Sequence, residues 1–505
     1  MLTDFRFAFR RLMARRAFFA VALSSLGLGI GAITVFFGFL NATLLKSLPI
    51  SRPSEVFSFV NARNDAPSHS YPNYLDFRNG AKTFDLSLYN FVRVSASFAP
   101  GSSQRLWGNT VAGNYFQLLG VKAAMGRTLS PDDDLKRGAH PVAVLTYGAW
   151  RRHLGSNPDV IGRKIKINGM DYTVVGVAEK GFNGVERIFQ SDIFIPIAMT
   201  SQVQPGATFL DQRDSEQTFL ISRLRPGVTP EHALSEANAI ATRIASQHPE
   251  SNEGYRIRLV EPGWAGDFLR GGVTTFSVAL LVAAIILLFV VCVNLAGILS
   301  ADASVRRKET AIRLAVGASH VHLIRQLLAE SLLLAASGAA LGLTLAWWGI
   351  EALNKLTPPI DISFNTVIEF DYRVLFFSIA VTLATGLILG LAPAWQATRT
   401  DLQLAMKKEL ADPRKRRLPL RDILIGIQVA LSVLLLATSG LMLRSLQNSL
   451  DIPLGFKPSS AAVIGIDSSL QGYDKTRQAI FQKTILDRLR ALPGIESVGV
   501  ADALP

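Results

Sequence analysis

Five stretches of this chain contain no Asp, Glu, Lys, Arg or His, and each is long enough to enter a lipid bilayer as a helix. They are residues 17–45, 271–301, 331–350, 374–398 and 423–443. A helix needs roughly 20 apolar residues to cross the hydrocarbon core. The pattern predicts a multi-pass α-helical membrane protein, with spans TM1 17–45, TM2 271–301, TM3 321–350, TM4 374–398 and TM5 422–443.

The first stretch follows a basic segment, residues 1–16, as a signal peptide would. It is long, however, and ends in Asn41-Ala42-Thr43 without a small-residue cleavage site. We therefore interpret it as an uncleaved anchor. The one cysteine, Cys292, lies within the second stretch, so we expect no intrachain disulfide and an inert thiol.

The formal net charge of +13 is concentrated beside the predicted spans. If the helices alternate in direction, residues 1–16, 302–320 and 399–421 all lie on one side. The positive-inside rule makes that side the cytoplasm. The basic run Arg414 to Arg417 is then a topology determinant near anionic lipid, and no nucleic-acid partner is expected.

The opposite side receives residues 46–270, 351–373 and 444–505. The first of these is polar and long enough to fold on its own. Short strands are expected at 142–146, 164–167, 172–177 and 192–197, and a helix at 230–247. The composition predicts an α+β domain in two subdomains.

Residues 444–505 resemble the start of a second such domain. We expect strands at 461–466 and 497–501 around a helix at 474–492. Because a single βαβ unit leaves sheet edges exposed, we expect this second repeat to be incomplete.

The sequence lacks the motifs of several enzyme classes. The GxxxxGK[ST] loop that cradles phosphates is missing; the nearest match, Gly120 to Thr128, has the wrong spacing and an Arg in place of Lys, and is interpreted as a turn. Asp132, Asp133 and Asp134 follow Ser130-Pro131, which is typical of a helix start. The histidines show no spacing typical of metal ligands.

We predict no catalytic residue, no metal and no cofactor in this chain. The charge-free stretches also argue against a proton-coupled carrier.

The first span carries closely spaced glycines, Gly27, Gly29 and Gly31. Gly27 and Gly31 have the four-residue spacing that lets helices approach closely. They are candidates for packing within the chain or for a dimer contact.

Several longer motifs identify a family. They include DFRFAFRRLMARRAFF, SYPNYLDFR (Ser70 to Arg78), GNYFQLLGVKAAMGRTL (Gly113 to Leu129), RRKETAIRLAVGAS (Arg306 to Ser319) and the final ALPGIESVGVADALP. With these motifs the chain resembles the MacB/FtsX-type permease superfamily, and specifically the acidobacterial duplicated orphan permease family. The resemblance covers nearly the whole chain.

The resemblance implies a bacterial inner-membrane protein with a large periplasmic core domain, which serves as a permease subunit of the ATP-binding-cassette type. Such a subunit transmits motion from a separate ATPase to its outer domains, for export or extraction of a substrate. The resemblance also implies a homodimer or heterodimer of permeases and, for some members, a periplasmic adaptor and an outer-membrane channel. ATP would be used by the partner, and the second repeat is expected to be truncated.

The segment between the second and third spans would then be the coupling helix that enters a groove of the ATPase. Its pattern predicts an amphipathic helix, which on composition alone fits anionic headgroups equally well. The candidate coupling residues are Arg306, Arg307, Glu309, Ile312, Arg313, Ala315 and Gly317.

Two other functions stay open. The chain could be an FtsX-like membrane regulator that controls a periplasmic enzyme without transport, or an envelope enzyme. No nucleophile, base or metal constellation supports the enzyme, and the substrate is not evident from the sequence.

Overall fold

The computed structural model describes residues 2–99, 102–187, 189–264, 269–305, 320–355, 368, 370–398, 420–450, 473 and 475–500. The chain divides into two compact units. One, the helical unit, comprises Met1–Lys46, Thr274–Pro359 and Val367–Pro453. The other comprises Ser47–Val273, Ile360–Thr366 and Leu454–Pro505; its first segment is called the core domain below.

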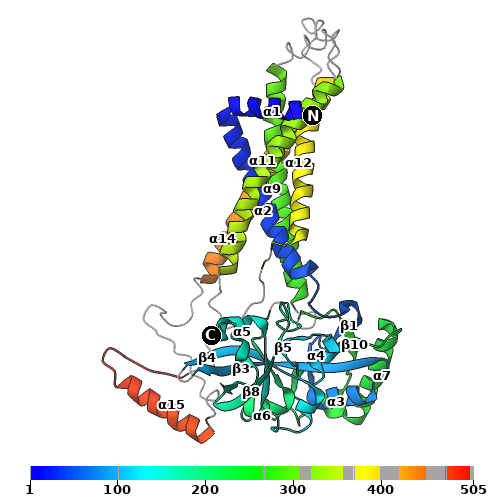
Figure 1. Ribbon diagram of the computed structural model, residues 1–505, viewed down its shortest axis with the longest axis vertical. Helices are drawn as coiled ribbons and strands as arrows, with labels where there is room; N and C mark the ends of the chain where they lie inside the picture. Colours follow the sequence, from blue (N-terminus) through cyan, green and yellow to red (C-terminus); the bar gives the residue numbers. More distant parts are fainter. Residues whose placement is uncertain are drawn as a thin grey trace. The chain divides into compact units, whose positions relative to one another are not determined.

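The helical unit contains the long apolar helices. They are α2 (Arg16–Leu40), continued by the π-helix η1 (Asn41–Leu45), α9 (Arg270–Val305), α11 (His320–Lys355), α12 (Tyr372–Thr398) and α14 (Leu420–Leu450). Among the described residues, five segments are long and apolar enough to cross a membrane: Arg16–Leu45, Arg270–Leu299, Ile324–Asn354, Tyr372–Leu391 and Ile425–Ser449. Helices α2, α11 and α12 run alongside one another (Figure 1).

The basic N-terminal segment forms a helix of its own, α1 (Leu2–Ala14). Its Ala8 and Leu12 are buried, and Leu12 joins the hydrophobic cluster of the long helices. The amphipathic pattern explains this arrangement, because apolar residues four apart lie on one face.

The third span is not free of charge along its full length. Segment Ile324–Asn354 includes Arg325, Glu330 and Glu351 toward its ends, although residues 331–350 carry none. A helix of 36 residues such as α11 is about 54 Å long, whereas the hydrocarbon core is about 30 Å thick. Backbone hydrogen bonding therefore continues the helix beyond the apolar stretch.

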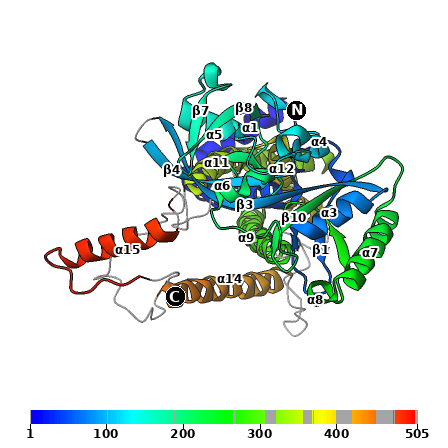
Figure 2. The same cartoon turned by 90° about the horizontal axis from the view of Figure 1, so that it is seen from below.

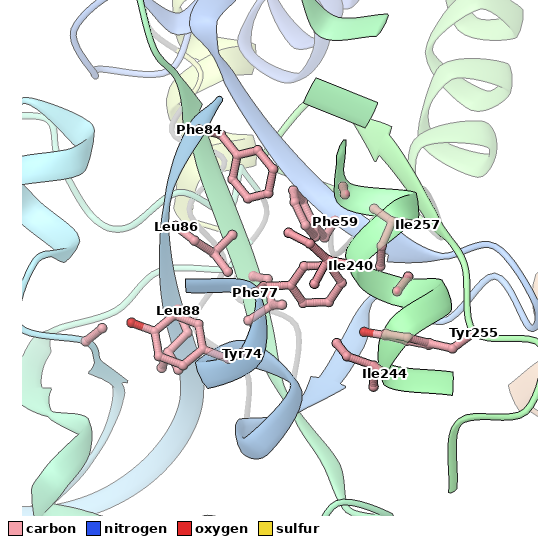
Figure 3. Close-up of a cluster of buried hydrophobic side chains, with 14 of the residues drawn as sticks. Phe59, Tyr74, Phe77, Phe84, Leu86, Leu88, Ile240, Ile244, Tyr255 and Ile257 are labelled. Carbon is pink, nitrogen blue, oxygen red and sulfur yellow. The ribbon is translucent and has the colours of Figure 1, made fainter. Parts of the chain in front are cut away.

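Within the core domain, the first part is an antiparallel sheet in the order β11-β1-β10-β3. The strands are β1 (Val56–Asn61), β3 (Phe84–Ala99), β10 (Glu216–Leu224) and β11 (Ile257–Val260), and β2 (Ser68–Ser70) pairs with β10. Helices α3 (Tyr71–Gly80) and α7 (Pro230–Gln247) lie beside it (Figure 2). Figure 3 shows the core between them, where the ring of Phe59 meets those of Phe77 and Phe84 at 5.5 and 5.4 Å.

The second part is a closed barrel, because β3 is long enough to serve both parts. Beyond β10, β3 pairs with β4 (Ser102–Val111), and the pairing continues through β9 (Ile193–Pro196), β6 (Val142–Leu145), β8 (Met170–Ala178) and β7 (Lys164–Ile167). Strand β7 returns to β3, with Ile167 opposite Ala96. Inward side chains such as Val94, Ile165 and Val174 fill the barrel. One continuous sheet thus joins the two predicted subdomains.

Short elements complete the described residues. They are α4 (Tyr115–Leu119), α5 (Tyr147–Leu154), α6 (Thr200–Val203), α8 (Pro249–Asn252), β5 (Ala123–Gly126), η2 (Pro53–Glu55), η3 (Pro131–Asp134), η4 (Pro158–Val160), η5 (Ile197–Met199) and α15 (Lys475–Arg490).

The strands expected at 142–146, 164–167, 172–177 and 192–197 correspond to β6, β7, β8 and β9, and the helix expected at 230–247 is α7. The strand expected at 497–501 is wrong, because residues 495–500 have no regular structure. A strand requires a neighbour for its backbone hydrogen bonds, and no described strand pairs with these residues. The strand expected at 461–466 lies outside the described residues.

Candidate functional site in the helix bundle

The predicted coupling segment lies outside the described residues. Helix α9 ends at Val305 and α11 begins at His320, so Arg306, Arg307, Glu309, Ile312, Arg313, Ala315 and Gly317 fall between them. Their role stays a prediction. What the structure does describe is how the helix that follows this segment packs against its neighbours.

Helix α2 approaches α11 through glycines on both helices. A Cβ atom added to Gly31 would lie 3.0 Å from the carbonyl oxygen of Gly342, and one added to Gly342 would lie 2.9 Å from the carbonyl oxygen of Gly27. Backbone atoms thus fill the space that side chains usually occupy. Contacts this close stabilise helix pairs in lipid, where packing replaces the hydrophobic effect.

The third glycine of the predicted stripe faces another helix. A Cβ atom on Gly29 would lie 3.1 Å from Cδ1 of Leu288 in α9. Gly27, Gly29 and Gly31 are all buried against helices of the same chain. Gly27 and Gly31 therefore pack helices within one chain. A dimer contact through them stays a prediction.

A second close contact joins α11 to α12, and sequence reasoning missed it. A Cβ atom on Gly386 would lie 2.8 Å from Cδ2 of Leu332, and one on Gly390 would meet Ser331 and Leu328. The signal was present, because Gly386 and Gly390 have the same four-residue spacing as Gly27 and Gly31. The pair Gly338 and Gly342 has it as well.

The core domain contains a buried polar group, the imidazole ring of His69. His69 in β2 is fully buried; its Nε2 lies 3.0 Å from the carbonyl oxygen of Phe59 and its Nδ1 lies 2.6 Å from the hydroxyl of Tyr255. Because a carbonyl only accepts, Nε2 carries the proton, and the Tyr255 hydroxyl donates to Nδ1. Burial lowers the pKa of His69 to about 4, which the hydrogen bond to Phe59 only partly offsets. The histidine is a neutral structural group.

The acidic triplet at 132–134 forms a helix start, as predicted. Ser130 and Asp133 make a reciprocal capping box, and Arg127 donates to both oxygens of Asp133 at 2.6 and 2.8 Å. Asp134 accepts the backbone N–H groups of Ala198 and Gly113 at 2.9 and 3.3 Å. Burial nevertheless raises its pKa to about 6. Within the described residues, no group of three or more His, Cys, Asp or Glu is placed to hold a metal ion.

The segment Gly120 to Thr128 is only partly the turn that its composition suggests. Gly120 has a φ of 68° and ends α4, whereas residues 123–126 form strand β5. A left-handed residue after a helix is the usual place for glycine.

Two family models match this chain. The MacB-like periplasmic core domain matches residues 19–240, and the FtsX-like permease C-terminal domain matches residues 281–402. Together they cover more than half of the chain, and the second match includes the predicted coupling segment.

Among curated proteins, the chain is similar to the macrolide export ATP-binding/permease protein MacB of Shigella sonnei (strain Ss046) and of Escherichia coli (strain K12). Each is 26% identical over 327 residues, which are 64% of this chain and 45% of the relative. The match therefore spans less than half the length of these relatives.

Two solved structures are similar to part of this chain at low TM-scores. The extracellular domain of the noncanonic ABC-type transporter YknZ from Gram-positive bacteria is 12% identical, covers 40% of this chain and 99% of that one, and has a TM-score of 0.31. The periplasmic region of MacB from Actinobacillus actinomycetemcomitans is 13% identical, covers 44% and 94%, and has a TM-score of 0.33.

The two family models match in the order in which the chain presents its parts, first an apolar helix with the core domain and then the helices from α9 to α12. By these matches, the chain belongs to the MacB/FtsX-type permease superfamily.

Proposed function

We propose that this chain is the permease subunit of an ATP-binding-cassette transporter of the bacterial inner membrane and acts by mechanotransmission. A separate ATPase would bind the segment at 306–319 on the cytoplasmic side. Its ATP-driven motion would move the helices and, through them, the periplasmic core domain, for export or extraction of a substrate. Permeases of this superfamily work with ATPases of this type, and the matched relatives are named ATP-binding/permease proteins.

One observation supports the proposal: α11, which follows the predicted ATPase-binding segment in the chain, packs against α2, which leads along the chain into the core domain. Helix α11 begins at His320, directly after that segment, and packs against α2 at Gly342, Gly27 and Gly31. Helix α2 and its π-helical extension end at Leu45, and the core domain begins at Ser47. Since closely packed helices move together, a displacement of α11 would reach the first residues of the core domain.

The proposal includes a dimer of permeases and no cofactor held by this chain itself. A periplasmic adaptor and an outer-membrane channel are further proposed partners, by analogy with macrolide export. The transported compound is left open, because in this mechanism the cargo would be held by surfaces of other proteins.

The test is co-purification of the full chain in detergent with candidate ATPases. The charge reversals Arg313→Glu and Glu309→Lys should each abolish association, because both side chains would face the groove of the ATPase. Arg151→Glu, at an exposed residue of α5 in the core domain, is the matched control and should leave association unchanged. Association that survives both reversals would contradict the proposal.

Identification of the co-purified proteins also separates this function from the regulator. An ATPase with an adaptor supports transport, whereas an ATPase with a periplasmic hydrolase and no adaptor supports an FtsX-like regulator.

A further inference from the structure

Helices α2 and α12 contact each other along an antiparallel line that becomes more polar toward the end of α2. The contacts are Thr34 Oγ1 with Ser378 Oγ at 3.1 Å, the stacked rings of Phe37 and Phe377 at 3.8 Å, Asn41 Nδ2 with Asp371 Oδ2 at 2.8 Å, and Arg373 Nη1 with the carbonyl oxygen of Leu45 at 2.6 Å. The last two contacts join residues 330 and 328 positions apart in the chain.

Asp371 uses each carboxylate oxygen for a different partner. Oδ1 accepts the backbone N–H groups of Arg373 and Val374 at 3.0 and 3.1 Å, which caps the first turn of α12. Oδ2 accepts from the side chain of Asn41, which is 2% exposed. Hydrogen bonds to an ionised acceptor are stronger than those between neutral groups, so this contact holds α2 to the start of α12.

Arg373 provides the second attachment, at Leu45, which lies four residues after Asn41 in the π-helix. The last carbonyl groups of a helix lack an N–H partner within the helix, and the guanidinium of Arg373 donates to one of them, on Leu45. Asn41 and Leu45 are the first and last residues of the π-helix, which closes with the Lys46 N–H donating to the Asn41 carbonyl at 2.8 Å. Short π-helical segments are frequent at functional sites.

The location of these contacts gives them their significance. Lys46 leaves the helix with extended backbone angles, and the core domain begins at the next residue. The π-helix is therefore the end of the helical unit from which the chain enters the core domain, and residues at the start of α12 contact both its first and its last residue.

We propose that Asn41, Asp371 and Arg373 form a clasp that makes this end of α2 and the start of α12 move as one body. A displacement of α12 is then passed to the chain that enters the core domain. The role in transmission rests on the proposed function, whereas the clasp itself is a property of the permease alone. Asn41, Asp371 and Arg373 are positioning residues, since they act through the backbone that they hold.

The experiment exchanges the two groups of the clasp. Asn41→Asp places a second carboxylate against Asp371 and should break the contact by repulsion. Adding Asp371→Asn to that variant restores one side-chain amide donor, now at position 371, and one carboxylate acceptor, now at position 41. Asn at position 371 can still cap the start of α12, because Asn is a good N-cap residue. The exchanged pair should therefore behave like the parent protein. Arg373→Leu removes the contact with Leu45, together with the contacts of Arg373 with the neighbouring Tyr372, and should have a partial effect.

Two measurements on the full chain in lipid nanodiscs report the clasp. In a Cys292→Ala background, spin labels at Leu45→Cys and Phe376→Cys, which are 47% and 67% exposed, report the distance between the helices by dipolar electron paramagnetic resonance. Amide hydrogen exchange of residues 372–376 reports the order of α12 without labels. Asn41→Asp should broaden the distance distribution and speed exchange at 372–376 roughly tenfold, and the exchanged pair should reverse both changes.

Thr34→Val is the matched control on the same helix pair. It removes the contact with Ser378, but Thr34 and Ser378 also donate to carbonyl groups in their own helices, at 2.7 and 2.8 Å. Thr34→Val should leave both measurements unchanged.

The clasp is refuted if Asn41→Asp gives the distance distribution and exchange rates of the parent, or if the exchanged pair keeps those of Asn41→Asp. Neither result depends on an ATPase, so failure here differs from failure of the association test.

Discussion

The helical unit and the core domain are stabilised in different ways. In the helical unit, the close contacts are made by glycines, and backbone meets backbone at Gly31 and Gly342. In the core domain, space is filled by large rings such as Phe59, Phe77 and Phe116, all at most 1% exposed. The difference follows from the solvent, because burying a ring gains free energy only where the alternative is water.

The comparison teaches where each unit tolerates change. The core domain depends on side-chain volume, so removing atoms should harm it. The contact between α2 and α11 in the helical unit depends on the absence of side-chain volume, so adding atoms there should harm it. Each prediction below tests one side of this contrast.

The largest effect is expected for Phe77→Ala in the core domain. Its ring lies against Phe59 at 5.5 Å and is fully buried, so its removal leaves a cavity (Figure 3). We expect a loss of about 3–5 kcal/mol in the free energy of unfolding of the core domain. Hydrogen exchange of the full chain in nanodiscs should show faster exchange in β1 and β10 with α2 and α11 unchanged. Equal acceleration in α2 would show that the two units do not unfold separately.

The next effect is expected for Gly342→Leu in α11. The new side chain would collide with the backbone of α2 and separate the helices, at a cost of roughly 1–3 kcal/mol. The measurement is thermal unfolding in detergent, followed by size-exclusion chromatography. Gly440→Leu in α14 is the control, since nothing lies within 4 Å of a Cβ atom there. If both variants are equally stable, close approach of α2 and α11 is not what stabilises the bundle.

The smallest effect is a dependence of core-domain stability on pH. The folded-state pKa of His69 is about 4, below its ordinary value of 6.5, so the unfolded chain binds the proton more readily. Stability from this group is therefore complete above pH 6.5 and declines as the pH falls toward 4, by about 2 kcal/mol between pH 7 and pH 5. Urea unfolding between pH 7 and pH 5, followed by hydrogen exchange of β1 and β2, measures this loss of stability. His69→Gln should remove this part of the slope; a slope that persists in that variant assigns it to other groups.

Much of the fold was predictable because its signals are local. The apolar stretches indicated the long helices, and the helical periodicity of residues 230–247 indicated α7. The paired glycines at 386 and 390 were equally visible, but spacing alone does not say which helix lies opposite. The strand expected at 497–501 failed because a strand depends on a partner that the local pattern does not contain.

The sequence by itself determined that the chain enters lipid several times, that a large α+β domain follows the first span, and that its motifs resemble those of a permease family. Those properties depend on composition and on periodicity within single elements. Only the tertiary structure decided that β3 serves an open sheet and a closed barrel at once, and that Asp371 meets Asn41. Both depend on contacts between distant parts of the chain, which are set by packing geometry and leave no periodic trace in the sequence.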